Sequence, residues 1–505
     1  MRHRKNRAAA IAATLGLAVS FAPPAAADTG TDSGELRAAV SVDNILFHLK
    51  ALQAVADANG GNRAAGTRGY EKSARYIEDQ LKDAGYEPVR QRFTYHRYDF
   101  VAAALERVSP TPRTYGYGAA DGYLDMHYSG AGEVTAPVSA VDINLAGDRS
   151  SSSGCEKADF KGFPSGHIAL IQRGTCGFRD KVDNATAAGA AGVVVFNQGD
   201  VVPGDDRQGL FGGTLEAPQA KVPVVSTTFD NGAELAGLGA ATLRLAVDAT
   251  VTRIKSFNIL ADTDGRADRK VVVGAHLDSV GEGPGINDNG TGLGTILETA
   301  IQFKETHEKA RNGVRFAFWG GEEDGLIGSD YYVSQLSDRQ IRDHAVNLNF
   351  DMVGSPNYVR YVYDGDGSSY GAAGPDGSGV VEKVFLDYFA SQGLPAAPTA
   401  FDGRSDYFGF IENGIPAGGL FTGAEALKTP EEAAVFGGTA GAPQDPCYHA
   451  ACDTLANVNT TVLDQMADAV AHATLTFAQT KSAVNGTATG KGFADLKFKG
   501  HSRLR

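Results

Sequence analysis

The chain has 505 residues, and its 46 lysines and arginines against 60 aspartates and glutamates give a formal net charge of −14. Hydrophobic residues make up 42% and charged residues 21%, a globular composition that excludes an intrinsically disordered chain. The acidic balance argues against nucleic-acid binding, which needs a basic surface, and the length allows about two or three domains.

The N-terminal segment has the pattern of an export signal. Positive charges within residues 2–7 precede an apolar stretch over 8–22, and three alanines at 25–27 supply a small-residue cleavage site. We therefore predict a signal peptide over 1–27 and a secreted, extracellular protein, with a retained anchor as the alternative. No other apolar run approaches the ~20 residues of a membrane span, so none is expected.

The first part of the mature chain is predicted to be mostly helical. Apolar side chains recur at helical spacing over 44–58 and again over 68–84, and Gly85 ends the second helix. A strand is predicted next, over 90–95.

The character of the chain changes over 98–250, where glycine, alanine and short β-branched runs dominate. The predicted elements of this stretch are strands over 167–172, 193–196 and 222–225 and an Ala-rich helix over 181–191. We therefore predict a compact α/β module inserted into a larger domain, which consists of 40–97 and 251–480.

Four cysteines follow the export signal: Cys155, Cys176, Cys447 and Cys452. An even number in an exported chain favours disulfides, and proximity in the sequence suggests the pairs Cys155–Cys176 and Cys447–Cys452. Zinc binding by these cysteines is the alternative, although their spacing matches no paired C-x-x-C finger.

Predicted strands and helices alternate after residue 253. The strands lie over 271–275, 314–319, 346–352 and 416–421, and the helices lie over 293–303 and 461–478. Buried apolar strands alternating with helices predict an α/β fold with a mixed, mostly parallel sheet flanked by helices. Residues 481–505 are polar and basic and are predicted to form a flexible tail.

Residue types that bind metals follow the strands of this last segment. In chain order they are His276, Asp278, Asp288, Glu322, Glu323, Asp351 and, much later, His449. Because ligands of open α/β sheets bind outside the carboxyl ends of the strands, side chains far apart in the sequence can converge there. Imidazole and carboxylate groups of this kind are typical zinc ligands.

The acidic side chains are too many for one zinc ion. Two ions about 3.5–4 Å apart would share a carboxylate and a water molecule. Two Zn²⁺ carry four positive charges, and Asp288, Glu323, Asp351 and a bridging hydroxide would balance them. Without metal, the same carboxylates would repel one another strongly.

One further string resembles a catalytic motif. GSSYG (367–371) fits the nucleophile-elbow string G-x-S-x-G, but it lies in a Gly/Asp/Ser loop over 364–379 and lacks the strand and helix that this motif needs. The sequence has neither a His-Glu-x-x-His helix nor a P-loop string. Each metal-binding pattern is also common alone in a structural role, and the prediction therefore rests on their occurring together.

The linked motifs resemble those of the secreted bacterial di-zinc leucine aminopeptidases, which are metallopeptidases of clan MH. The resemblance covers 40–95 and 255–480. The strings that carry it are GNR (61–63), AHLDS (275–279), GINDNG (285–290), WGGEE (319–323), NFDMVG (349–354), FDGRSD (401–406) and CYHAACD (447–453). The inserted segment, with RGTCGF (173–178), resembles a protease-associated (PA) domain.

The resemblance implies two zinc ions per chain and a role for each matched residue. His276 and Asp351 would hold one zinc ion, Glu323 and His449 the other, and Asp288 would bridge them. The remaining implied roles are a general base and acid (Glu322), a donor to the tetrahedral oxyanion (Tyr448) and an orienting partner of His276 (Asp278).

The resemblance also implies how substrate is held. Arg404, Met352 and Phe421 match positions that line the pocket for the substrate amine and side chain, which implies a preference for large apolar, leucine-like first residues. The Cys447–Cys452 disulfide would brace the loop that carries the second histidine.

Some of these relatives bind calcium through acidic residues at both ends of the catalytic domain. Asp464 and Asp468 match one half of such a site. The other half has alanine and valine at 39–40, where an acid is expected, with only Asp43 nearby. Only half of a calcium site is therefore present in the sequence.

Three other functions fit the same scaffold. A carboxypeptidase would need basic residues for a C-terminal carboxylate, for which Arg404 is the candidate, and a single-zinc cyclase is a related possibility. A non-catalytic receptor-like protein would have lost metal ligands, whereas all five are present. We therefore expect a monomeric zinc aminopeptidase that acts on peptides with a free N-terminus.

Overall fold

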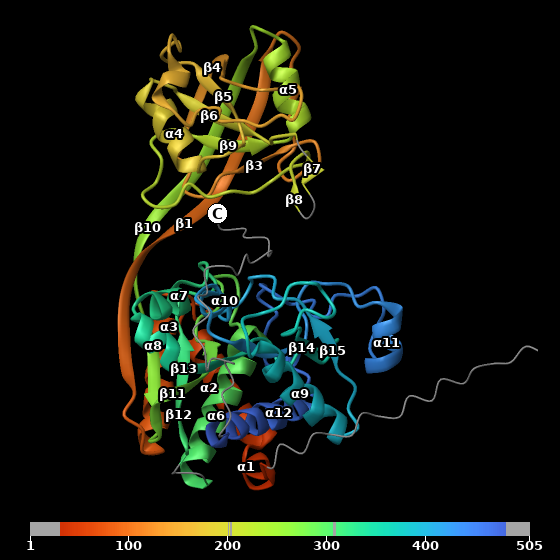
Figure 1. Ribbon diagram of the computed structural model, residues 1–505. Coiled ribbons are helices and arrows are strands. Elements are labelled where there is room, and N and C mark those ends of the chain that lie inside the picture. Colours follow the sequence, from red (N-terminus) through yellow and green to blue (C-terminus); the bar gives the residue numbers. More distant parts are fainter. Residues whose placement is uncertain (1–30, 200, 203–204, 307–309, 481–505) are drawn as a thin grey trace, which may run out of the picture.

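The computed structural model describes residues 31–480 except 200, 203–204 and 307–309. The predicted signal peptide and the predicted tail lie outside the described residues. A larger body carries the predicted metal-binding residues, and a smaller body, the insert, lies above it in Figure 1, joined by two long strands. This arrangement confirms an α/β fold with an inserted module.

The larger body is built on a mixed, mostly parallel sheet. Its strands in spatial order are β15 (Ala397–Thr399), β14 (Tyr361–Tyr363), β16 (Ala417–Phe421), β13 (His344–Phe350), β11 (Arg266–His276), β12 (Asn312–Trp319) and β10 (Thr242–Asp262). The central strands β16, β13, β11 and β12 are parallel. On one side β14 is antiparallel to β16, and on the other β10 is antiparallel to β12. The carboxyl ends of the four central strands therefore meet at one edge.

Helices cover both faces of this sheet, because the central strands β11 and β12 have apolar side chains on both sides. On β11, Val271, Val273 and Ala275 pack on one face and Val272 on the other. The first face is covered by α1 (Gly34–Ala39), α2 (Val42–Asp57), α3 (Arg68–Asp83), α6 (Gly292–Thr306), α9 (Ser378–Ser391) and α12 (Thr460–Gln479). The second is covered by α7 (Ile327–Ser334), α8 (Asp338–Asp343) and α10 (Phe408–Glu412). None of the helices among the described residues combines the length and apolar character needed to cross a bilayer.

The sheet of the insert continues from that of the larger body through β10, which pairs with both β12 and β4 (Gly132–Val141). Its strands are β4, β5 (Ile168–Gln172), β6 (Gly192–Phe196), β9 (Val224–Thr227) and β3 (Tyr123–Asp125). Helices α4 (Phe178–Ala187) and α5 (Phe229–Gly237) pack on its opposite faces. The Cys155–Cys176 disulfide lies here and Cys447–Cys452 lies in the larger body, which confirms both predicted pairs.

Two antiparallel strands connect the bodies. β1 (Val89–Ser109) pairs with β10 along its whole length, from Val89 opposite Leu260 to Ser109 opposite Thr242. The sequence predicted only the strand over 90–95, because the exposed middle of β1 lacks an apolar pattern. Both strands pass without a break through 97–98 and 250–251, where the sequence placed the domain boundaries.

The remaining predicted elements are present with small shifts. The helix predicted over 181–191 is α4, which starts three residues earlier and ends at Ala187, where Ala188 caps it and Gly189 takes a positive φ. The GSSYG string lies in the loop between β14 and α9, as expected.

Acid is expected to destabilise the larger body through His344, the first residue of β13. Its ring is buried between the Tyr332 hydroxyl and the Gln340 carbonyl, and burial lowers its pKa from 6.5 to about 4. Because the folded state disfavours the protonated ring, the neutral ring contributes to the free energy of unfolding. This contribution is complete above pH 6.5 and is lost as pH falls towards 4.

Unfolding in urea at pH 7.5 and pH 5 tests this expectation. The free energy of unfolding of the wild type, relative to that of His344→Gln, should fall by about 2 kcal/mol at the lower pH. An equal difference at both pH values would contradict the assignment to this ring.

Candidate metal centre

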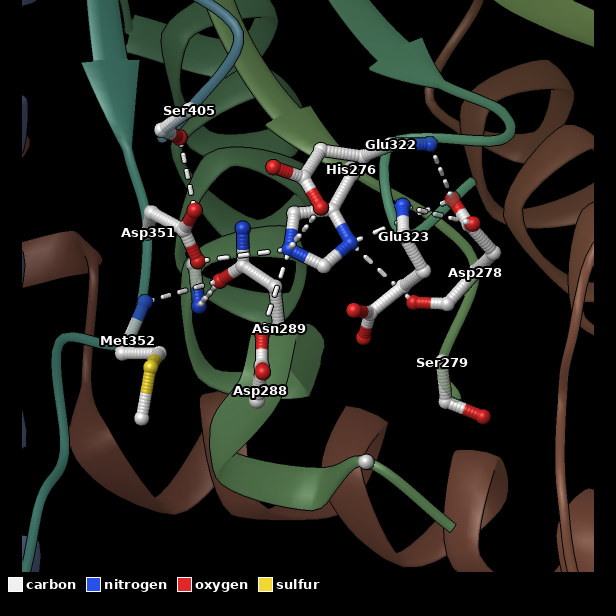
Figure 2. A network of polar contacts seen from close by, with 12 residues as sticks. His276, Asp278, Ser279, Asp288, Asn289, Glu322, Glu323, Asp351, Met352 and Ser405 are labelled. Atoms are coloured by element: carbon white, nitrogen blue, oxygen red, sulfur yellow. Dashed lines mark hydrogen bonds and ion pairs between the residues drawn. The ribbon is translucent and has the colours of Figure 1, made fainter. Parts of the chain in front are cut away.

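The predicted metal-binding side chains converge at the carboxyl edge of the central strands, and Figure 2 shows all of them except His449. His276 ends β11, Glu322 and Glu323 follow β12, and Asp351 follows β13. Asp288 comes from the turn η2 (Ile286–Thr291), which leads into α6. The loop before α12 brings in His449 from the far end of the sequence.

Asp288 lies between the two histidines. Its Oδ1 is 3.2 Å from Nε2 of His276, and its Oδ2 is 3.2 Å from Nε2 of His449. Each histidine has a second carboxylate: Asp351 Oδ1 lies 3.3 Å from His276 Nε2, and Glu323 Oε2 lies 3.0 Å from His449 Nε2. The five side chains thus form two groups of three that share Asp288.

These spacings fit zinc. Four ligands at about 2.1 Å around a tetrahedral ion lie about 3.4 Å from one another, close to the separations seen here. In addition, Oε1 of Glu323 is buried and has no hydrogen-bond partner among the described residues. Imidazole nitrogens and carboxylate oxygens are also the donor set that Zn²⁺ prefers.

The electrostatics of the cluster favour bound positive charge. Burial opposes protonation of His449, but its contacts with Asp288 and Glu323 raise its pKa to about 10. Burial, reinforced by Asp288, raises the pKa of Glu323 to about 8. Burial also opposes protonation of His276, but the charges of Asp351 and Glu322 raise its pKa well above the usual value. Without metal, the cluster therefore keeps protons that a cation would replace.

Glu322 stands slightly apart from the two groups. Its Oε2 lies 3.9 Å from His276 Nε2, and the side chain is 9% exposed. Burial, together with the charges of Asp351 and Asp406, raises its pKa well above the usual value. A carboxylate at this position, beside the cluster, has a proton affinity suited to acid–base chemistry.

Asp278 holds the loop that carries the two glutamates. Its carboxylate accepts hydrogen bonds from the backbone N–H groups of Gly321, Glu322 and Glu323, at 2.9, 3.3 and 3.4 Å. The nearest approach of this carboxylate to His276 Nδ1 is 3.9 Å, whereas the backbone carbonyl of Asp278 lies 3.1 Å from that nitrogen. The backbone carbonyl of Asp278 therefore orients the His276 imidazole, and the carboxylate of Asp278 orients the loop after β12.

Three residues inside the quoted motifs support the cluster, although no role was predicted for them from the sequence. Ser405 donates a 2.6 Å hydrogen bond to Asp351 Oδ2. The guanidinium of the fully buried Arg63 donates to three backbone carbonyls of the segment 277–285. The carboxylate of Asp453 accepts from the backbone N–H groups of Asn287 and Asp288, at 2.8 and 2.9 Å.

Asp453→Asn is expected to weaken metal binding. An amide offers one acceptor oxygen instead of two, so one of the two buried N–H groups loses its partner and the turn that presents Asp288 shifts. Metal affinity should fall by about 10–100-fold, measured by competition with a chromogenic chelator. Asp264→Asn, an exposed site in the turn between β10 and β11, is the control. Equal affinities of the two variants would contradict this role.

The residues predicted to bind substrate line a small cavity beside the cluster. The cavity has about 70 Å³, and Met352, Phe421, Arg404 and Tyr448 lie in its wall. The Arg404 guanidinium pairs with Glu425 at 2.9 Å and donates to the Tyr448 hydroxyl at 3.2 Å. The Tyr448 ring stacks on His449, with ring centroids 3.8 Å apart.

The residues matched to a calcium site share one cavity with an arginine. Asp464 and Asp468 lie beside α1, but Arg37 of that helix places its Nη1 3.6 Å from Asp468 Oδ2. The side chain of Arg37 already supplies a positive charge there, and among the described residues Asp43 is the one further acid that lines this cavity. Three carboxylates and one guanidinium therefore face this cavity among the described residues.

Comparison of the sequence with known proteins finds relatives that are named peptidases, in agreement with the cluster of metal-ligand side chains. The model of peptidase family M28 matches residues 258–474, and that of the PA domain matches 134–235. The chain is 45% identical to an aminopeptidase of Pseudomonas aeruginosa over 438 residues, which cover 86% of this chain and 80% of that protein. It is 38% identical to leucine aminopeptidase 2 of Trichophyton tonsurans over 453 residues, or 88% and 86% of the two chains.

A solved structure extends the comparison to three dimensions. The crystal structure of BSAP, a zinc aminopeptidase from Bacillus subtilis, superimposes with a TM-score of 0.54 at 25% identity. The match covers 90% of this chain and 98% of that one, and therefore includes both the larger body and the insert.

Proposed function

Because the chain belongs to peptidase family M28, we propose that it is a secreted aminopeptidase that uses two zinc ions to remove leucine-like residues from the N-terminus of peptides. The observation that carries this proposal is the position of Asp288, whose two oxygens each face a different histidine. That arrangement supports a bridging carboxylate. His276 and Asp351 would complete one zinc site, and Glu323 and His449 the other.

Glu322 supplies the proton transfers. When bound, the zinc ions polarise the scissile carbonyl and lower the pKa of the attacking water. Glu322, which touches neither imidazole closely, accepts the proton of that water and passes it to the leaving amine. The Tyr448 hydroxyl donates a hydrogen bond to the oxyanion that forms from the carbonyl.

Binding of the free N-terminus follows from the charges around the cavity. Asp288, Glu323 and Asp351 border it, and a substrate ammonium group can pair with carboxylates there. The small cavity that these carboxylates border has room for one side chain. Met352 and Phe421 give it apolar walls, which supports a preference for leucine and similar residues, as in the named leucine aminopeptidase relative.

The alternative functions have less support. A carboxypeptidase needs a free cation for the substrate carboxylate. The Arg404 guanidinium is already paired with Glu425 through both of its terminal nitrogens, Nη1 and Nη2. A non-catalytic receptor has no use for the five converging metal-ligand side chains, all of which are present.

Secretion is supported by the cysteines. Both pairs form disulfides, and no free cysteine is left among the described residues. Disulfides of this kind persist in oxidising compartments, outside the cytosol. The signal-peptide pattern of the sequence agrees with this location.

The proposed activity is tested with two peptides that differ only in N-acetylation. The chain should release leucine from Leu-Gly-Gly and leave acetyl-Leu-Gly-Gly intact, and metal analysis should find about two zinc ions per chain. Cleavage of both peptides would contradict an aminopeptidase. Release of the C-terminal glycine instead would support the carboxypeptidase.

A further inference from the structure

A second, larger cavity lies between the insert and the larger body. This interdomain cleft has about 620 Å³, the size of a site for a ligand of several residues. One wall comes from the insert, with His127, Tyr128, Thr214 and Glu216. The other comes from the loops after β11 and β12, with Glu282 and Asp324 among its residues.

The cleft opens onto the metal centre. Glu323 lines both the cleft and the small cavity that holds Met352 and Phe421. The small cavity, at about 70 Å³, has room for one side chain, whereas the cleft reaches Tyr128 and Glu216 of the insert. A peptide whose first residue fills the small cavity can therefore continue past Glu323 into the cleft.

The charges of the cleft are mostly negative. Among the described residues that line the cleft, Arg97 is the only lysine or arginine. Its Nε lies 2.8 Å from Asp99 Oδ1, so the charge of Asp99 neutralises that of Arg97. Glu216 and Glu282 are exposed carboxylates on opposite walls, and Asp324 adds a third. The unneutralised charges of both walls therefore have the same sign.

Aromatic rings line the side next to β1. The Tyr98 ring lies 5.4 Å from that of His127 and 5.8 Å from that of Tyr128, measured between centroids. The Tyr128 hydroxyl donates to the backbone carbonyl of His96, which ties the insert to the connecting strand. Faces of tyrosine rings beside carboxylates attract guanidinium and ammonium groups.

We propose that the interdomain cleft binds the part of the peptide that follows the cleaved bond and selects for lysine or arginine there. This inference rests on the proposed aminopeptidase function. It gives the insert a direct part in substrate recognition: Glu216 supplies one carboxylate to the downstream chain, and Glu282 of the larger body supplies its counterpart.

The test compares two peptides with the same first two residues, Leu-Gly-Lys-Gly-Lys and Leu-Gly-Glu-Gly-Glu. In the wild type, kcat/KM for leucine release should be at least about fivefold higher for the lysine peptide in low salt. The ratio should approach one in about 1 M NaCl, where the Debye length is about 3 Å. A wild-type ratio near one in low salt would overturn the proposal.

Variants locate the selectivity. The double variant Glu216→Gln/Glu282→Gln should lower the lysine-to-glutamate ratio towards one, whereas Glu87→Gln, an exposed site near the start of β1 and outside the cleft, should keep the wild-type ratio. An unchanged ratio in the double variant would overturn the proposal. Leucine-p-nitroanilide, which has no downstream residues, separates the two hypotheses: if it is not cleaved, the proposed function fails, and if it is cleaved while the ratio is flat, only the cleft proposal fails.

Discussion

Replacing Glu322 with glutamine is expected to lower kcat for leucine-p-nitroanilide by about 10²–10⁴-fold, the usual contribution of a general base, while zinc content stays at two ions per chain. The amide has nearly the shape of the carboxylate but cannot take up a proton at neutral pH. Zinc is expected to remain because the closest contacts among the five ligand side chains, at 3.0–3.3 Å, do not include Glu322.

Two measurements separate the possible roles of this residue. Turnover close to that of the wild type would reject the assigned base. A variant that has lost zinc would show instead that Glu322 is a ligand. Glu431→Gln, on the exposed N-terminal turn of α11 (Pro430–Phe436), controls for a change of charge far from the cluster.

Removal of metal is expected to abolish activity, and added zinc is expected to restore it at about two ions per chain. The chelated protein should also melt at a lower temperature, since a ligand that binds only the folded state stabilises it. Protons compete with zinc, because the acidic neighbours hold the pKa of both histidines above its usual range. The chelator should therefore remove zinc more readily at pH 5 than at pH 8.

Two ligand variants make this expectation specific to a bridged pair. His449→Ala should lose one of the two zinc ions and keep the other, because the group of His276 and Asp351 is intact. Asp288→Ala should lose both, since this carboxylate faces each histidine. One zinc ion retained by Asp288→Ala, with wild-type affinity, would contradict a shared carboxylate.

The sequence predicted the parts of the fold whose reason is local. Strands β11 and β12 have apolar side chains on both faces, and β13 has them on one. The three strands follow one another with a helix or loop between, so a parallel sheet and its ligand-bearing edge could be inferred. β1 could not be predicted beyond residue 95, because its exposed middle is held by backbone pairing with a strand about 150 residues later.

The same distinction applies to the metal centre. His276, Asp288 and Asp351 could be named because metals demand particular side chains. Arg63 and Asp453 could not be given a role, because each acts on backbone groups of a segment that only the fold brings near. The carboxylate of Asp278 falls in this second class as well, since it accepts from three N–H groups more than 40 positions along the chain.

Strand β10 belongs to both bodies at once. At one end Leu260 lies opposite Ala317 of β12, and at the other Leu243 lies opposite Ala136 of β4. Excising the insert at 98–250 would cut β1 and β10 in the middle of their pairing, where Arg97 lies opposite Thr252 and Tyr98 lies opposite Val251. Anyone who wishes to exchange inserts between relatives must therefore splice within the β1–β10 ribbon, in matching register, so that the hybrid inherits an uninterrupted edge.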